Sequence, residues 1–97
     1  MTELKLFSSR KRPLKPLVEA ALNNELRLLE AGIQRTKLRL QAFENQHGFS
    51  TDEFVQRYEN NKLGETLDFD EWIGESRLLA RLQEKADTLR EINLIDN

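Results

Sequence analysis

Apolar side chains recur at a regular interval across the first half of the chain, between about residue 17 and residue 47. The intervals alternate between four and three residues without a break, which is the repeat of a coiled-coil seam or of an antiparallel helical hairpin. We call this face the inner seam; it consists of Leu22, Leu26, Leu29, Ile33, Thr36, Leu40, Phe43 and His47. The pattern predicts one long helix that packs against another helix.

A second apolar face lies on the opposite side of the same predicted helix. We call it the outer stripe; it consists of Leu14, Leu17, Ala21, Leu28, Ala31, Leu38 and Ala42, interrupted at Asn24 and Arg35. One partner helix covers only one face of another helix, so the outer stripe requires a further helix from the same chain or from another one. We therefore expect Leu28 and Leu38 to contact a protein partner.

The stretch HGFSTDEF, residues 47–54, has the signals of a helix end followed by a helix start. Gly48 suits the left-handed residue that ends a helix. Ser50 suits an N-cap, and Glu53 three residues later completes a capping box, while Phe49 and Phe54 occupy the two staple positions. This combination predicts that a new helix begins directly after Ser50.

The same pattern recurs at LDFDEW, residues 67–72, and predicts the start of a third helix. Asp68 is the expected N-cap, Glu71 its partner in the capping box, and Leu67 with Trp72 the expected staple. The helix that follows carries an apolar stripe and alternating charges on the rest of its surface.

These patterns predict an all-α fold, an antiparallel hairpin or three-helix coiled-coil-like bundle. The expected helices cover residues 17–47, 51–60 and 69–92, and residues 93–97 are expected to fray. The side chains expected to form an aromatic core at the turn are Phe43, Phe49, Phe54, Tyr58, Leu63, Leu67 and Trp72. Residues 1–16 are expected to form an extended arm and residues 17–97 the helical domain. Residues 1–9 are compatible with a short strand that pairs in a dimer, with another protein, or not at all.

Composition narrows the class of protein. The chain has 97 residues, of which 33% are charged and 38% apolar, which suits one small domain of exposed helices. It contains no cysteine, which excludes a disulfide framework, a thiolate nucleophile and sulfur-ligated zinc. No apolar run is long enough to span a membrane, and the N-terminus lacks the apolar core of a secretion signal. We therefore expect a cytoplasmic protein without a membrane partner.

Charge is divided unevenly between the arm and the rest of the chain. Residues 1–15 carry five basic side chains and one acidic one, a balance of +4, whereas the remainder has a balance of −6. Arg10, Lys11 and Arg12 form the densest basic cluster. They suit contact with nucleic-acid phosphates or with an acidic partner, and a solvated leader is the alternative.

Two groups of residues were weighed as chemical sites. Glu44 and His47 have the Glu-x-x-His spacing of helical di-iron proteins, but such sites need a second pair, and packing or capping at the helix end is favoured. The neighbouring carboxylates at residues 52–53 and 68–71 lie in predicted first turns, where the helix dipole stabilises them. No phosphate-binding glycine loop, catalytic triad order or metal quartet is present. We expect no enzyme activity, cofactor or metal.

Tyr58 and Trp72 are aromatic residues at the same end of the predicted bundle. A tryptophan in a staple position is more often a core residue than an interface residue. If this end binds a partner, these two side chains are the expected contact points.

One combination of residues goes beyond general helix signals. It consists of Phe43-Glu44, His47-Gly48-Phe49-Ser50, Glu53-Phe54, Tyr58, Leu63-Gly64-Glu65 and Asp70-Glu71-Trp72. Over about residues 40–80 it resembles a group of short helical prokaryotic proteins that are often encoded beside a small toxin gene and are regarded as antitoxin-like. This group has an aromatic residue where His47 stands, and the basic arm is not part of its pattern. The resemblance implies a helical fold and no catalytic residue.

Two functions follow from this reading. The first is a non-catalytic, protein-binding module, an antitoxin-like homodimer that neutralises a small toxin through helical contacts. The alternative is a nucleic-acid-associated or regulatory protein that uses the basic arm.

Overall fold

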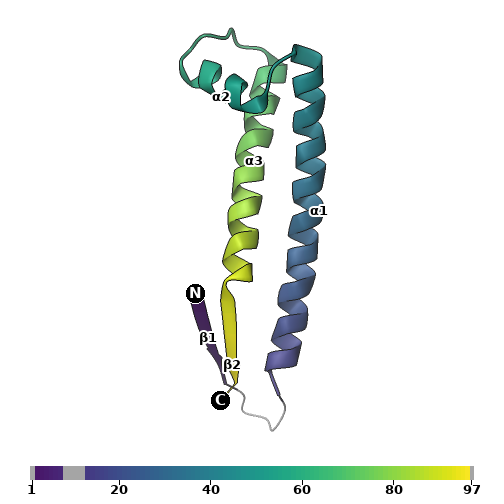
Figure 1. Ribbon diagram of the computed structural model, residues 1–97, viewed down its shortest axis with the longest axis vertical. Helices are drawn as coiled ribbons and strands as arrows, with labels where there is room; N and C mark the ends of the chain where they lie inside the picture. Colours follow the sequence, from purple (N-terminus) through teal and green to yellow (C-terminus); the bar gives the residue numbers. More distant parts are fainter. Residues whose placement is uncertain (1, 8–12, 97) are drawn as a thin grey trace.

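The computed structural model describes residues 2–7 and 13–96, and shows an elongated helical hairpin with a pair of short strands at its open end (Figure 1). The elements in chain order are β1 (Thr2–Leu6), α1 (Lys15–His47), α2 (Thr51–Glu59), α3 (Leu67–Arg90) and β2 (Ile92–Asp96). Its extents are 61 × 22 × 18 Å, and the Cα radius of gyration is 19.2 Å. A compact domain of this length would have a radius of gyration of about 12–13 Å. The hairpin is therefore a rod with a large surface for its mass.

α1 and α3 lie side by side and antiparallel, as the inner seam predicts (Figure 1). α1 has 33 residues and is therefore about 50 Å long. Pro16 lies in its first turn, where the missing N–H costs nothing. Gly48 ends it in the left-handed conformation, with φ at 81°, as predicted.

The start of α2 confirms the helix start and the Ser50 N-cap read at residues 47–54, but Glu53 pairs with Arg57 and does not complete the predicted capping box. The Ser50 hydroxyl accepts a hydrogen bond of 3.1 Å from the backbone N–H of Glu53. The Glu53 carboxylate contacts Arg57 at 2.7 Å. Glu44, from the last turn of α1, accepts a 2.7 Å hydrogen bond from the backbone N–H of Thr51. Both the N-cap and the preceding helix therefore satisfy the free N–H groups of α2.

The predicted start of α3 was wrong by two residues. The N-cap is Thr66, whose hydroxyl accepts a 3.1 Å hydrogen bond from the backbone N–H of Phe69. Asp68 therefore lies inside the first turn, where its carboxylate accepts a 3.0 Å hydrogen bond from Gln46 of α1. Leu67 is 80% exposed, so it belongs neither to a staple nor to the aromatic core. Threonine caps a helix by the same hydrogen bond as aspartate, and the two candidates stand two residues apart.

The inner seam is confirmed as the buried face of α1. Leu29, Ile33, Thr36 and Leu40 are buried, and the other members of the seam are half-buried. The core forms two clusters along the rod. One surrounds Leu40, Phe54, Trp72 and Ile73 at the turn, and the other joins Leu29 and Ile33 to Ala86.

The two strands change the expected fold. β1 pairs with β2 in parallel, with Thr2 opposite Ile92 and Leu6 opposite Asp96. The chain is mostly helical as predicted, but residues 92–96 form a strand and do not fray. Likewise, β1 pairs within its own chain rather than with a partner. Figure 1 shows that both termini therefore lie at the end of the rod opposite α2.

β2 also packs against the start of α1. Leu94 is 6% exposed and is the buried residue of this end, while Ile92 and Ile95 are half-buried. The sheet thus covers apolar surface that α3 no longer reaches, because α3 ends at Arg90.

Gly32 within α1 and Gly48 directly after it should respond in opposite ways to substitution by alanine. A Cβ on Gly32 would lie 3.4 Å from the Leu82 side chain, an ordinary contact distance. We expect Gly32→Ala to raise the free energy of unfolding by up to about 1 kcal/mol through helix propensity. Gly48→Ala should lower it by about 1–2 kcal/mol, because alanine is strained at a positive φ. Urea unfolding followed by circular dichroism measures both, and a stabilised Gly48→Ala protein would contradict this account.

Candidate partner-binding surfaces

Trp72 joins the three helices at the closed end of the rod. Its side chain is fully buried, and its ring stacks parallel to that of Phe54 of α2 with 4.0 Å between centroids. Phe43 of α1 stacks on it at 5.6 Å. The indole Nε1 donates a 3.0 Å hydrogen bond to the hydroxyl of Thr51. Trp72, a candidate contact residue in the sequence, is thus placed in the core and is not on a surface that a partner can reach.

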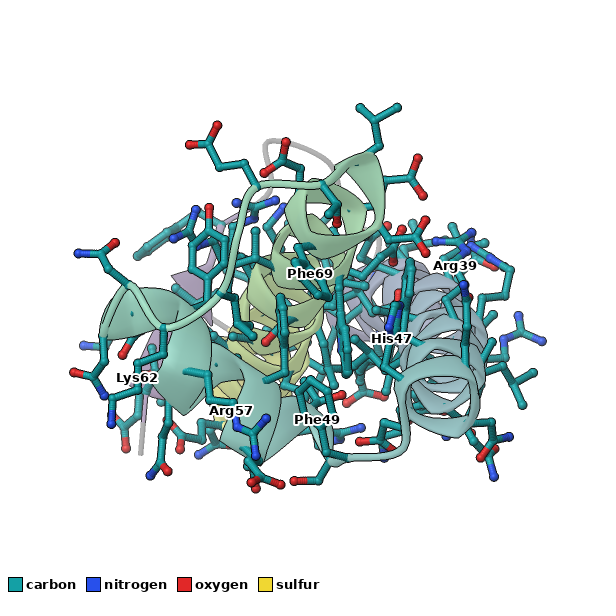
Figure 2. All side chains as sticks on the ribbon, turned by 90° about the horizontal axis from the view of Figure 1, so that it is seen from above. Arg39, His47, Phe49, Arg57, Lys62 and Phe69 are labelled. Atoms are coloured by element: carbon teal, nitrogen blue, oxygen red, sulfur yellow. The ribbon has the colours of Figure 1, made fainter. Side chains whose placement is uncertain are left out.

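Tyr58 lies at the edge of the same cluster. It is half-buried, and its ring is 5.8 Å from that of Phe54. Nearby, the Arg57 guanidinium lies over the half-buried Phe49 ring at 4.7 Å, so that an arginine covers this aromatic face (Figure 2). Tyr58 and Phe49 are therefore only partly accessible to a partner.

His47 and Glu44 serve packing and capping in this structure. The His47 ring lies 5.3 Å from each of the rings of Trp72 and Phe69, and Figure 2 shows it pointing into the aromatic cluster. Its Nε2 is 3.4 Å from the Asp68 carboxylate but forms no hydrogen bond there. The Glu44 carboxylate accepts a hydrogen bond from the first backbone N–H of α2. The Glu-x-x-His pair is thus used within the fold.

Two of the neighbouring carboxylates at residues 52–53 and 68–71 have structural partners. Glu53 is paired with Arg57, and Asp68 with Gln46. Within residues 2–7 and 13–96, no group of three or more histidine, aspartate or glutamate side chains is placed to hold a metal ion.

Two hollows, of about 680 and 530 Å³, lie along the surface between α1 and α3. The larger is lined mostly by charged and polar side chains. Arg90 in it contacts Glu30 at 3.0 Å and Asp87 at 3.1 Å, so both acidic side chains of this hollow are ion-paired. The smaller is bordered by the ion pair of Arg39 and Glu75, at 3.1 Å. Both hollows are grooves between ion-paired helices.

α3 leaves the leucines and alanines of the outer stripe within α1 exposed. Leu17 is 65% exposed, Leu28 60% and Leu38 66%, and the alanines between them are also exposed. In Figure 1, α3, α2 and both strands lie on the other side of α1. Leu28 and Leu38 are thus placed together on one accessible helix face, as the sequence predicts.

The basic cluster of Arg10, Lys11 and Arg12 lies outside the described residues. Of the neighbouring basic side chains, Lys5 is exposed on β1, and Lys15 is 4.0 Å from Glu19. In the sequence the cluster stands between the residues of β1 and those of α1.

Sequence reasoning missed one surface, the edge of the small sheet. In the part of the chain that the structure describes, β1 pairs with β2 alone, which leaves its other edge open. Leu4 and Phe7 beside this edge are 42% and 71% exposed. The apolar and β-branched residues between 92 and 95 were the available signal for the second strand.

No helix in residues 2–7 and 13–96 has both the length and the apolar character needed to cross a membrane. No protein-family model matches the chain, and neither the curated proteins nor the solved structures contain a match.

The hydrogen bond between Trp72 and Thr51 gives a direct test of how the closed end is held. We expect Thr51→Val to lower the free energy of unfolding by about 1–3 kcal/mol, because the buried indole N–H loses its acceptor. Thr51→Ser keeps the hydroxyl and should stay within about 1 kcal/mol of the unchanged protein. Urea unfolding followed by the fluorescence of this single tryptophan measures both. Equal stability of the valine and serine variants would contradict the assignment.

Proposed function

We propose that this chain is a non-catalytic protein-binding module of the antitoxin type, which neutralises a small toxin through contacts made by α1. The observation that supports the proposal is the exposure of Leu17, Leu28 and Leu38 on a face of α1 that lies away from its buried inner seam. A row of exposed leucines on a small protein marks a surface that another protein covers.

The geometry of the outer stripe favours a helical partner. Its leucines follow the 3.5-residue repeat with which one helix packs along another. Leu17 and Leu38 are 21 residues apart, so the exposed leucines of the stripe span about 32 Å. A helix of the partner that carries its own apolar seam would lie along this face, as amphipathic helices lie in apolar grooves.

The proposal that the partner is a toxin is based on the residues of the closed end. The sequence from Phe43 to Trp72 resembles antitoxin-like proteins, and in this structure these residues serve caps and packing rather than a chemical step. On this proposal the closed end fixes the hairpin, and α1 presents the binding face. The protein would act where such toxins act, in the cytoplasm.

Co-expression with the small protein encoded beside this gene tests the proposal. We expect the unchanged chain to restore growth of cells that make the toxin and to co-purify with it. Leu28→Asp/Leu38→Asp should abolish both effects, because burying each leucine contributes about 1.5–3 kcal/mol and the affinity should fall roughly 100-fold or more. Both leucines are exposed, so the melting temperature of the variant should stay within a few degrees.

Leu67→Asp is the matched control for this experiment. Leu67 is 80% exposed and lies at the start of α3, away from the outer stripe, so this variant should neutralise the toxin fully. If Leu28→Asp/Leu38→Asp protects cells as well as the unchanged chain, the outer stripe is not the toxin-binding face. If the neighbouring protein is harmless and does not co-purify, the antitoxin function itself is wrong.

The uneven charge favours a second candidate function, contact with nucleic acid through the arm. Arg10, Lys11 and Arg12 contribute three of the five positive charges in residues 1–15. If all three contact phosphates of duplex DNA, replacing them with alanine should reduce the slope of log affinity against log salt by about 3. Fluorescence anisotropy with a labelled duplex at several salt concentrations measures this. Absence of binding by the unchanged chain at about 50 mM salt would exclude this function.

A further inference from the structure

The order of large and small residues along the outer stripe has a symmetry of its own. Within α1 the stripe occupies positions spaced by four and three residues in strict alternation. These are Leu17, Ala21, Asn24, Leu28, Ala31, Arg35, Leu38 and Ala42. All eight are exposed. Two positions are polar, three are leucine and three are alanine. When this order is reversed, each leucine takes the place of an alanine, each alanine that of a leucine, and each polar residue that of the other polar residue.

Two copies of α1 that run antiparallel bring unlike residues together in every layer. With the two-fold axis midway between residues 29 and 30, the facing pairs are Leu17 with Ala42, Ala21 with Leu38, Asn24 with Arg35, and Leu28 with Ala31. Each large side chain then faces a small one, which lets the two helices approach closely and interdigitate. The two polar interruptions meet each other instead of facing leucine.

The polar layer distinguishes antiparallel from parallel pairing. In the antiparallel arrangement the Arg35 guanidinium of one copy faces the Asn24 amide of the other, whose oxygen can accept from it. Arg27 already donates to that oxygen at 3.3 Å within its own chain, and a carbonyl oxygen has a second lone pair. A parallel pair would instead place Arg35 against Arg35, leucine against leucine and alanine against alanine. Like charges in one layer disfavour that arrangement.

The rest of the molecule leaves room for this contact. The paired segment, residues 17–42, is about 39 Å long. The eight stripe positions are exposed, so nothing in residues 2–7 and 13–96 covers them, and in Figure 1 α2, α3 and both strands lie on the same side of α1. A two-fold axis also closes the assembly at two copies, because each copy uses its whole stripe once.

We propose that in the free protein the outer stripe is covered by a second copy of this chain, with the two α1 helices antiparallel in this register. The inference rests on the proposed role of the stripe as a protein-binding surface and names the partner that occupies it when no toxin is present. The product is a homodimer in which two α1 helices form the centre and two α3 helices the outer layers.

Sedimentation equilibrium of the purified chain tests the dimer. We expect a mass twice that of the 11.4 kDa chain at micromolar concentration. Leu28→Asp should be monomeric at the same concentration, because it places a carboxylate in the central layers. Leu67→Asp should remain dimeric. A monomeric unchanged chain, or a dimer that Leu28→Asp leaves intact, overturns the proposal; the second result would point to another surface such as the open edge of β1.

Charge exchange tests the register. Asn24→Lys places a lysine opposite Arg35 of the second copy and should weaken the dimer at least tenfold. Asn24→Lys/Arg35→Glu places lysine opposite glutamate and should restore the dimer to the affinity of the unchanged chain or better. In a parallel dimer the single variant would face Lys with Lys and Arg with Arg, and the double variant Lys with Lys and Glu with Glu, so the double variant would not recover the affinity. Failure of the double variant to recover overturns the antiparallel register, and circular dichroism confirms that each variant is folded.

This experiment can fail independently of the proposed function. A monomeric chain whose Leu28→Asp/Leu38→Asp variant no longer neutralises the toxin would overturn the homodimer and leave the toxin-binding stripe intact. A dimer that behaves as described, from a chain that neutralises no toxin, would leave the homodimer intact and overturn the antitoxin function.

Discussion

The fold depends on the way one buried indole holds three helices at the closed end. Trp72 of α3 stacks on Phe54 of α2 and on Phe43 of α1, and its N–H is satisfied by Thr51. Because aromatic rings bury large areas in specific geometries, this cluster fixes where α3 begins relative to α1. The register of the inner seam then follows over the length of the rod. At the far end it brings the last residues of the chain beside the first.

A second constraint follows from the helical hairpin itself. A helix with apolar residues on two opposite faces cannot bury both against one neighbour, and α3 covers only the inner seam of α1. The remaining leucines are exposed along a rod whose radius of gyration is 19.2 Å, far above that of a compact domain of the same length. Such a shape suits a protein whose work is done by surface contact. The same reasoning connects the proposed toxin-binding face with the proposed homodimer, since both follow from the uncovered side of α1.

Local signals predicted the helices well where one residue type had a clear role. Gly48 ends α1, and Ser50 caps α2, because positive φ and an exposed N-terminal N–H each favour a few residue types. The start of α3 was less certain from sequence, because Thr66 and Asp68 are both good caps. In the structure Thr66 is the cap, and the Asp68 carboxylate instead accepts a hydrogen bond from Gln46 of α1. That contact joins residues 22 positions apart and has no local signature.

Among the candidate partner-binding residues too, the sequence placed some correctly and left others undecided. The spacing of Leu28 and Leu38 along a helix is a property of the sequence, and it was enough to place them together on one face. The sequence does not determine whether Trp72 lies in the core or on a surface, because a staple position and an interface position have the same local pattern. The ring partners from α1 and α2 bury it completely.

The sequence by itself determined the helices and the two faces of α1, because both depend on residues within a few turns of one another. Only the tertiary structure decided the fate of the chain ends. Residues 2–6 and 92–96 are too short to signal a sheet alone, and a two-stranded pair gains stability only where another surface supports it. The hairpin brings these segments together and lays β2 against α1, where Leu94 becomes buried. Pairing between residues about 90 positions apart depends on the length of the rod, which no local sequence pattern predicts.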